Sequence, residues 1–266
     1  SPLPVSGLGM TVFAAPFKGV APNASVLFGV ELRGRDLSLA PNDAVEISYL
    51  AVDAQGKSRA GNVDRIKLNL RPETKARVEQ SGFRILNRLE LPPGRYQLRL
   101  ASHDTVGGSV GSVIYDLEVP DFYRQSFSMS GLVVTSLSGA SMLTVRPDEQ
   151  LAAVLPAPPV SLRSFPQNDE VAVFTEVYDN SGSSPHKVDI VATVTSDEGK
   201  VLFTTDEQRD SSELQGKRGG YGYATRVPLS DIAPGLYVLK VEARPRLGQG
   251  ATALREILFR GTPKAP

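Results

Sequence analysis

A turn that leads into a strand occurs twice in this chain and limits what it can fold into. The first copy spans residues 91–100 and the second spans residues 232–241. In each copy a proline fixes φ, a glycine lets the chain leave the turn, and apolar side chains then alternate with polar ones, as in a half-buried strand. The key residues are Pro93, Gly94 and Tyr96 in the first copy and Pro234, Gly235 and Tyr237 in the second.

The tyrosine in each copy favours one class of fold. A tyrosine that follows such a corner is typical of immunoglobulin-like sandwiches, where its hydroxyl group bonds to nearby backbone. Two corners predict two sandwiches, and a length of 266 residues suits two domains. We therefore expect an all-β protein of two tandem immunoglobulin- or fibronectin III-like β-sandwich domains, residues 1–120 and 121–266.

Alternating apolar residues predict the strands of the first domain. The expected strands span residues 8–18, 25–33, 44–53, 63–71, 83–91, the corner strand, and 109–119. The second half repeats this order at a nearly constant offset, which supports tandem domains. It also contains a proline-rich insertion at about 136–168, in which residues 148–154 form the only helix that we predict. The insertion is long for a structureless loop, so it crosses between sheets, packs against the first domain, or carries function.

The composition excludes several classes of function. The chain has no cysteine, which rules out disulfides, thiolate catalysis and cysteine-ligated zinc. Its 29 basic and 29 acidic residues cancel, so no net field draws it to nucleic acid or to an anionic membrane. No apolar run approaches the roughly 20 residues that span a bilayer. We predict no cofactor.

Few residues suggest chemistry. His103 and Asp104 lie near Ser109, but no Gly-x-Ser-x-Gly motif is present and the other histidine, His186, is distant in sequence. We therefore predict no catalytic site and no enzyme activity. The glycine-rich stretch 107–111 lacks the ending of a phosphate-binding loop and is interpreted as a hairpin turn.

The stretch 179–183, Asp-Asn-Ser-Gly-Ser, resembles the start of a calcium loop. An EF-hand loop would need a glutamate at residue 190, which is Ile190. Residues of these types also form ordinary turns. A calcium site would need the loops to converge, and its candidate ligands are Asp179, Asp206, Glu207 and Asp210.

Two other groups of residues have two interpretations each. Tyr221 and Tyr223 could stack on a sugar, but their alternation with Val227 and Leu229 indicates a buried face. Seven basic residues of the first domain fall on outward faces of predicted strands. They form either an ordinary solvated sheet face or a surface for an acidic partner, such as the second domain. They are Arg65, Lys67, Arg71, Arg84, Arg88, Arg95 and Arg99.

Several segments resemble the C-terminal region of bacterial von Willebrand factor A-related proteins, a type abundant in Acidobacteria. They are residues 1–8, 14–19, 93–96, 117–122 and 173–180. The resemblance covers nearly the whole chain. It implies an exported, extracytoplasmic protein whose von Willebrand A domain, with its metal site, lies upstream of a pair of β-sandwiches.

These observations favour a non-catalytic structural or protein-interaction region of an exported bacterial protein. A partner would be another protein, such as the upstream domain of the same chain, bound through loops or a sheet edge. The alternative is an adhesion module that depends on carbohydrate or calcium. The oligomeric state stays open.

Overall fold

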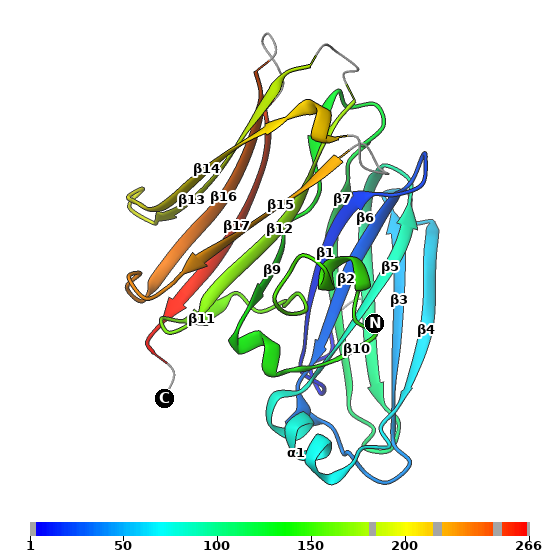
Figure 1. The fold of residues 1–266 in the computed structure, drawn as a ribbon. Helices are drawn as coiled ribbons and strands as arrows, with labels where there is room; N and C mark the ends of the chain where they lie inside the picture. The colour runs from blue at the N-terminus through cyan, green and yellow to red at the C-terminus, as the bar shows by residue number, and fades with distance from the viewer. Residues whose placement is uncertain (1–3, 181–184, 215–219, 247–251, 265–266) are drawn as a thin grey trace.

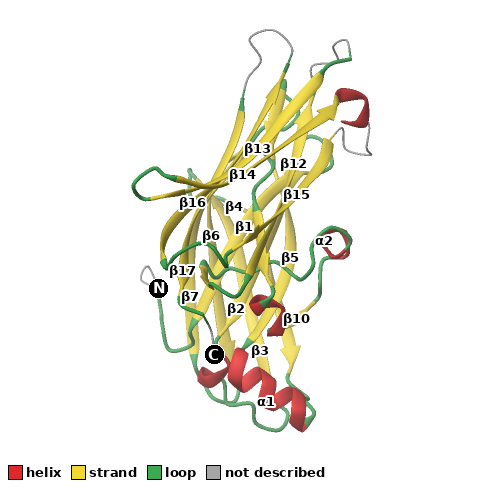
Figure 2. Cartoon of the chain, turned by 60° about the vertical axis from the view of Figure 1, so that its left-hand side comes forward, coloured by secondary structure: helices red, strands yellow, loops and turns green. Residues whose placement is uncertain are grey.

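The computed structural model describes residues 4–180, 185–214, 220–246 and 252–264, and it is built almost entirely of strands (Figures 1 and 2). The strands form four sheets, which pack in pairs as two sandwiches. The all-β sandwich fold expected from the sequence is confirmed. Among the described residues, no helix has the length and apolar character needed to cross a membrane.

The first sandwich contains residues from the first half of the chain and one short strand from the second. One sheet has the order β1 (Met10–Lys18), β2 (Ala24–Leu32), β5 (Phe83–Leu91) and β10 (Leu143–Val145). The other has the order β4 (Ser58–Lys67), β3 (Ala44–Asp53), β6 (Gly94–Asp104) and β7 (Val110–Val119). All neighbours are antiparallel except β10, which pairs parallel to β5.

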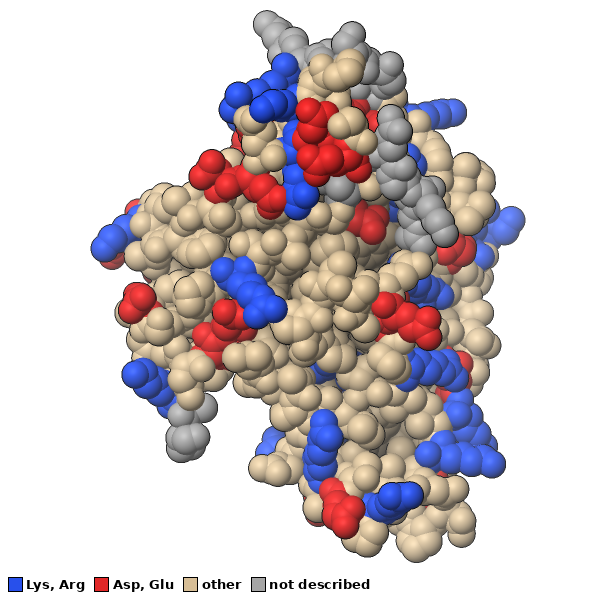
Figure 3. Space-filling model, in the orientation of Figure 1, with Lys and Arg blue, Asp and Glu red and all other residues tan. Residues whose placement is uncertain are grey.

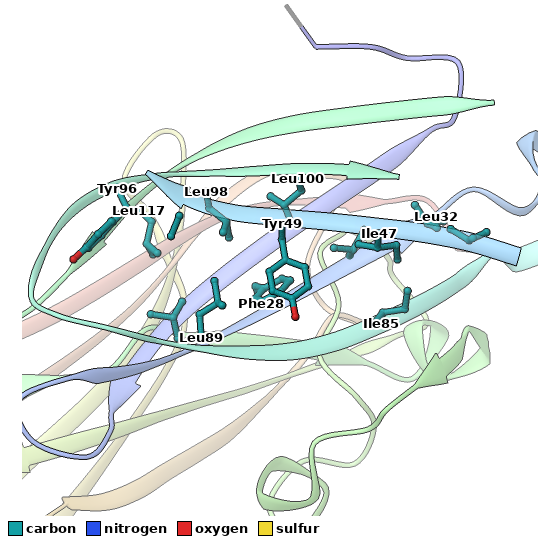
Figure 4. Packing of buried hydrophobic residues seen from close by; sticks show 14 of the residues in the cluster. Phe28, Leu32, Ile47, Tyr49, Ile85, Leu89, Tyr96, Leu98, Leu100 and Leu117 are labelled. Carbon is teal, nitrogen blue, oxygen red and sulfur yellow. The ribbon is translucent and has the colours of Figure 1, made fainter. Parts of the chain in front are cut away.

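Alternation along these strands builds the core between the two sheets. Ile47 and Tyr49 point inward from β3 and meet Phe28 of β2, whose ring centroid lies 4.8 Å from that of Tyr49. Figure 4 shows these side chains between the sheets, together with Leu98 and Leu100 from β6. The predicted inward faces of strands 44–53 and 83–91 therefore form the core.

The second sandwich follows in the chain. One sheet has the order β15 (Gly220–Pro228), β12 (Glu170–Asp179) and β8 (Phe127–Met129), and β9 (Val133–Ser136) also pairs with β12. The other has the order β11 (Ser164–Pro166), β17 (Ala253–Thr262), β16 (Gly235–Pro245), β13 (Lys187–Ser196) and β14 (Val201–Asp210). Two apolar clusters fill the space between them.

Both predicted tyrosine corners form. The hydroxyl of Tyr96 donates to the carbonyl of Pro92 at 2.8 Å, and that of Tyr237 donates to the carbonyl of Ala233 at 2.5 Å. Each ring is buried in the core of its own sandwich. The glycine of each turn lies against its tyrosine ring, and Gly94 has a φ of 155°.

One prediction about the first domain is wrong. The expected strand 63–71 ends at Lys67, and the chain then forms a helix, α1 (Pro72–Ser81), that the sequence analysis did not identify. A proline at the first helical position suits a helix start. Only Val78 of α1 is buried, so the helix lacks the apolar stripe that would have revealed it. The expected short helix in the insertion is present as α2 (Glu149–Ala152).

A fourth apolar cluster joins the two sandwiches. Its members come from the outer face of the β1–β2–β5 sheet, from β9 and β12, and from α2 and the residues after it. They are Phe13, Ala15, Phe17, Leu27, Leu86, Val133, Leu151, Leu155, Ala172 and Phe174. Every residue of β2 is buried, because one face packs in the first sandwich and the other lies against the second. The four sheets therefore form one continuous stack.

The proline-rich insertion packs against the first domain, which is one of the three outcomes expected for it. Arg84 of β5 is fully buried; its Nε donates to Oε1 of Glu31 at 2.9 Å, and its other nitrogens donate to the carbonyls of Gly139 and Pro158 at 3.0 Å. Glu31 also accepts from the hydroxyl of Ser161. A buried ion pair on the first domain thus holds the insertion through three of its residues.

Candidate functional site

A groove of about 860 Å³ runs along the junction of the two sandwiches. Its lining comes from β1 and β7 of the first sandwich and from β8 and β17 of the second. Figure 2 brings β7 and β17 forward beside one another. Grooves between domains are common places for ligands, so this groove is the candidate site.

The wall formed by β17 has an open strand edge. Within the described part of the chain, β17 pairs with β16 on one side, whereas β11 covers its other side only at residues 260–262. The N–H group of Arg260 donates to the carbonyl of Arg163, so it points away from β16. Backbone groups of alternate residues point to the same side of a strand. The N–H groups of Leu254, Glu256 and Leu258 therefore also point toward this open edge.

The wall formed by β7 is arranged in the same way. Among the residues that the structure describes, 5–8 pair with only the first part of β7. The N–H of Ser112 donates to the carbonyl of Val5, and the carbonyl of Val110 accepts from the N–H of Leu8. By the same alternation, the backbone groups of Ile114, Asp116 and Glu118 point toward its open edge. Two strands with unpaired segments thus border one groove.

Two arginines lie half-buried in the groove. Arg255 donates to the carbonyls of Met129 and Ser130 at 2.5 and 2.9 Å, which ties β17 to the segment after β8. Nη1 of Arg163 donates to the carbonyls of residues 160–162. Burial lowers the pKa of both guanidinium groups. Both remain charged near neutral pH because arginine titrates so far above it.

The other polar groups of the groove differ in burial. Ser128 of β8 is 3% exposed, and its hydroxyl has no hydrogen-bond partner among the residues that the structure describes. Asp116, Glu118 and Glu256 are exposed at the rim, and within the same part of the chain none of them takes part in an ion pair. The groove therefore has a buried hydroxyl in its floor and three carboxylates at its rim, of which Glu118 lies opposite Arg95 and Glu256 lies opposite Lys240 in the neighbouring strands.

The structure separates the two residues that suggested catalysis. His103 and Asp104 are consecutive in β6, so their side chains lie on opposite faces of the sheet. His103 is half-buried near Glu46, whereas Asp104 is fully buried and accepts from the backbone N–H groups of Ser38 and Gly107. Asp104 therefore anchors the loops at this end of the sandwich. The glycine-rich stretch 107–111 forms the expected hairpin between β6 and β7.

The candidate calcium ligands do not meet in the described residues. Asp206 and Glu207 are consecutive in β14 and lie on opposite faces of its sheet. Asp210 accepts hydrogen bonds from Ser212. Asp179 instead pairs with His186, Oδ2 to Nε2 at 2.8 Å, at the buried end of β12. Residues 181–184 of the proposed loop lie outside the described residues, and the described part contains no metal-binding group of three such side chains.

The structure also places the tyrosines that suggested a sugar site. Tyr223 is buried in the core of the second sandwich, as its alternation predicted, and burial raises the pKa of its hydroxyl group. The side chain of Tyr221 lies outside the described part of the chain. The ring of Tyr223 is therefore core and is not available to a sugar.

The seven basic residues that were expected on outward faces fall into three groups, of which the first, Arg65, Lys67 and Arg71, is exposed as predicted. Arg84 and Arg88 contact the insertion, and Nε of Arg88 lies 2.7 Å from Oδ2 of Asp148. Arg95 and Arg99 lie on the opposite, outer sheet and border a second hollow of about 710 Å³ that also contains Asp53 and other carboxylates. On the face seen in Figure 3, both charge signs lie side by side.

Sequence reasoning missed the groove and its residues. Arg255 carried a usable signal, because it lies between the inward residues Ala253 and Ile257 of a strand. An inward-pointing charge in an apolar alternation is typical of a strand at the edge of a sheet. Ser128 and Arg163 lie in short segments without such a pattern, so nothing in the sequence marked them.

No protein-family model matches the chain, and neither does any curated protein. Similar solved structures include a protein described as a β-galactosidase from Bacteroides fragilis (12% identity, TM-score 0.33), which matches 89% of this chain and 32% of that chain. A calcium-binding mutant of Bacteroides uniformis β-glucuronidase 2 (10%, 0.34) matches 97% and 28%. Dimeric latent PorU from Porphyromonas gingivalis (11%, 0.35) matches 98% and 20%. The chain spans about a third or less of each, and these scores are too low to support a functional comparison.

Proposed function

We propose that this chain is a non-catalytic structural or protein-interaction region of an exported bacterial protein. The observation that carries the proposal is the pair of open strand edges, on β7 and β17, that face one groove. Unpaired strand edges bind other chains through backbone hydrogen bonds, and natural proteins usually cover or disrupt the edges that they do not use.

The junction between the sandwiches supports this role. A contact of ten buried apolar residues and the Arg84–Glu31 ion pair hold the two walls of the groove in a fixed relation. A binding surface that is already in its bound geometry loses less entropy when a partner binds. The resemblance to von Willebrand factor A-related proteins adds the expectation of an extracytoplasmic location.

Affinity capture from the envelope of the source organism tests the proposal. The immobilised chain is exposed to envelope extract with and without calcium, and an unrelated β-sandwich protein serves as the control. We expect saturable retention of a protein partner that does not depend on calcium. Retention of polysaccharide, or retention only with calcium, would favour the adhesion module instead.

Two further measurements test the remaining parts of the proposal. Cell fractionation with an antibody against the chain should place it outside the cytoplasm. The purified chain should not turn over a panel of hydrolase substrates that includes glycosides. Turnover that disappears in a variant of the groove would contradict the non-catalytic assignment.

A further inference from the structure

The ends of β1 and β12 meet at a buried lysine. Lys18, the last residue of β1, is 6% exposed, and its Nζ donates to Oδ1 of Asn180 at 2.8 Å. Asn180 directly follows β12, so the two residues belong to different sandwiches and are 162 positions apart in the sequence. From this contact we propose that Lys18 and Asn180 become joined by an isopeptide bond once the chain has folded.

The surroundings of Lys18 do not neutralise its charge. Its Nζ lies 4.8 Å from the ring centroid of Tyr123 and 5.7 Å from that of Tyr178. Two carboxylates are near: Glu176 accepts from the hydroxyl of Tyr178, and Glu90 lies beside the residue that follows Lys18. In the described part of the chain, neither forms an ion pair with Lys18. A buried cation without a carboxylate partner costs free energy, so a reaction that removes its charge stabilises the fold.

The side chain of Asn180 is held in one orientation. Its Nδ2 donates to the carbonyls of Phe122 and Gln125 at 2.6 and 2.7 Å, and its backbone N–H donates to the carbonyl of Ser126 at 2.8 Å. Because both partners of Nδ2 are acceptors, the oxygen of the amide group must face Lys18. The fold therefore presents a fixed carboxamide to a buried amine, and such positioning replaces a bimolecular encounter.

The reaction exchanges one amide for another. Burial lowers the pKa of the Lys18 ammonium group, which increases the share of neutral amine that can attack. The ammonium group loses a proton to water, and Nζ then forms a bond to Cγ of Asn180. The bond from Cγ to Nδ2 breaks, one proton passes from Nζ to Nδ2, and ammonia leaves and takes up a proton from water. The carbonyls that accept from Nδ2 stabilise the positive charge that this nitrogen gains as it departs.

The link would change how the chain carries a pulling force. Without it, a force between the two ends acts on every element in turn. With it, the force passes directly from Lys18 to Asn180, and the elements from β2 to β12 carry no load. The junction of the two sandwiches would then stay closed under tension.

Mass spectrometry of the intact, folded protein tests the proposal. The purified chain should be lighter than its sequence mass by one ammonia. Trypsin should release residues 1–33 and 164–187 as one linked product, because an acylated Lys18 is no longer a cleavage site. Fragmentation of this product should place the link at Lys18 and Asn180. The full sequence mass, with no linked product, would overturn the proposal.

Matched variants separate this bond from other losses of ammonia. Lys18→Arg keeps a cation at the position but removes the nucleophile, and Asn180→Ala removes the group that is attacked. Both should have their full sequence mass, whereas Lys57→Arg, at an exposed position, should still lack one ammonia. An asparagine also loses ammonia when it closes a ring with its own backbone. A loss that persists in Lys18→Arg would therefore contradict the link.

A denaturing gel gives an independent readout. The unmodified chain should migrate ahead of Lys18→Arg, because a closed loop between residues 18 and 180 keeps the unfolded chain more compact. Equal migration of the two would count against the link. This inference does not rest on the interaction role: envelope capture can succeed without the link, and the link can form in a chain that retains no partner.

Discussion

The rings of Phe17 and Phe174 stack across the junction of the two sandwiches, with centroids 6.3 Å apart and planes inclined by 22°. Phe17 belongs to β1 of the first sandwich and Phe174 to β12 of the second, and both are at most 5% exposed. Their contact makes the junction part of the protein's core, so the stability of each sandwich depends on the other.

Phe174→Ala should lower the free energy of unfolding by about 3–5 kcal/mol, because it leaves a cavity in the junction. It should also split the unfolding transition in calorimetry into two, since the sandwiches would lose much of their coupling. Leu236→Ala, at an exposed position of β16, is the control and should change little. A single transition in Phe174→Ala would show that the junction does not couple the sandwiches through this ring.

Arg84→Met should lower the free energy of unfolding by about 3–5 kcal/mol. The change leaves the carboxylate of Glu31 buried without its cation and removes the donors to Gly139 and Pro158. Urea denaturation measures the loss, and Arg95→Met, on the exposed outer sheet, is the matched control. Proteolysis within residues 136–168 should become faster in Arg84→Met alone. Equal stability in the two variants would rule out this anchoring role.

Tyr96→Phe and Tyr237→Phe should each cost about 1 kcal/mol of stability, because each removes one hydrogen bond and keeps the ring. The two residues lie in different sandwiches, so the double variant should lose the sum of the two effects. Chemical denaturation of the three variants tests this expectation. A much larger loss in the double variant would mean that the two corners are coupled through the junction.

Stability should fall in acid partly because of Asp104. Burial opposes ionisation of this carboxyl, but hydrogen bonds from the backbone of Ser38 and Gly107, with the side chain of Asp43, and from the backbone of Val106 outweigh it and lower its pKa. Because the pKa of Asp104 is lower in the folded protein than in the unfolded chain, the ionised carboxylate stabilises the fold at pH values above the unfolded pKa of about 3.9. This stabilisation is lost as the pH falls through the lower pKa of the folded protein.

Asp104→Asn should therefore lower stability by about 1–3 kcal/mol at neutral pH and flatten the loss of stability below about pH 4. Urea midpoints between pH 2 and pH 7 measure both effects. Asp116→Asn, on the exposed rim of the groove, is the control for the removal of one charge. A pH profile of Asp104→Asn that parallels that of the unmodified protein would contradict the role of Asp104.

The sequence predicted the parts of the fold that local patterns determine. Strands 44–53 and 83–91 have the predicted limits, and both tyrosines form their corners, because alternation and turn chemistry are local properties. The prediction of a strand at 63–71 was wrong at its C-terminal end for a related reason. Leu68 is buried as its alternation suggested, yet it lies beyond the strand, so a side chain's burial did not reveal the backbone conformation.

The junction and the groove could not be predicted in this way. Arg84 alternates like an exposed residue, and it is buried only because Gly139 and Pro158, far along the chain, cover it. Likewise, the groove exists because β7 and β17, from different halves of the chain, border the same space. Patterns within one strand say nothing about which surfaces of two domains will meet.

The burial of both faces of β2 has an evolutionary consequence. A fragment that ended at Val119 would expose Phe13, Phe17, Leu27 and Leu86 to water as one sheet face. Such a half could not be duplicated, exchanged or fused elsewhere without a new cover for that face. Although the sequence contains two copies of one motif, the smallest unit that recombination can move intact is the pair of sandwiches.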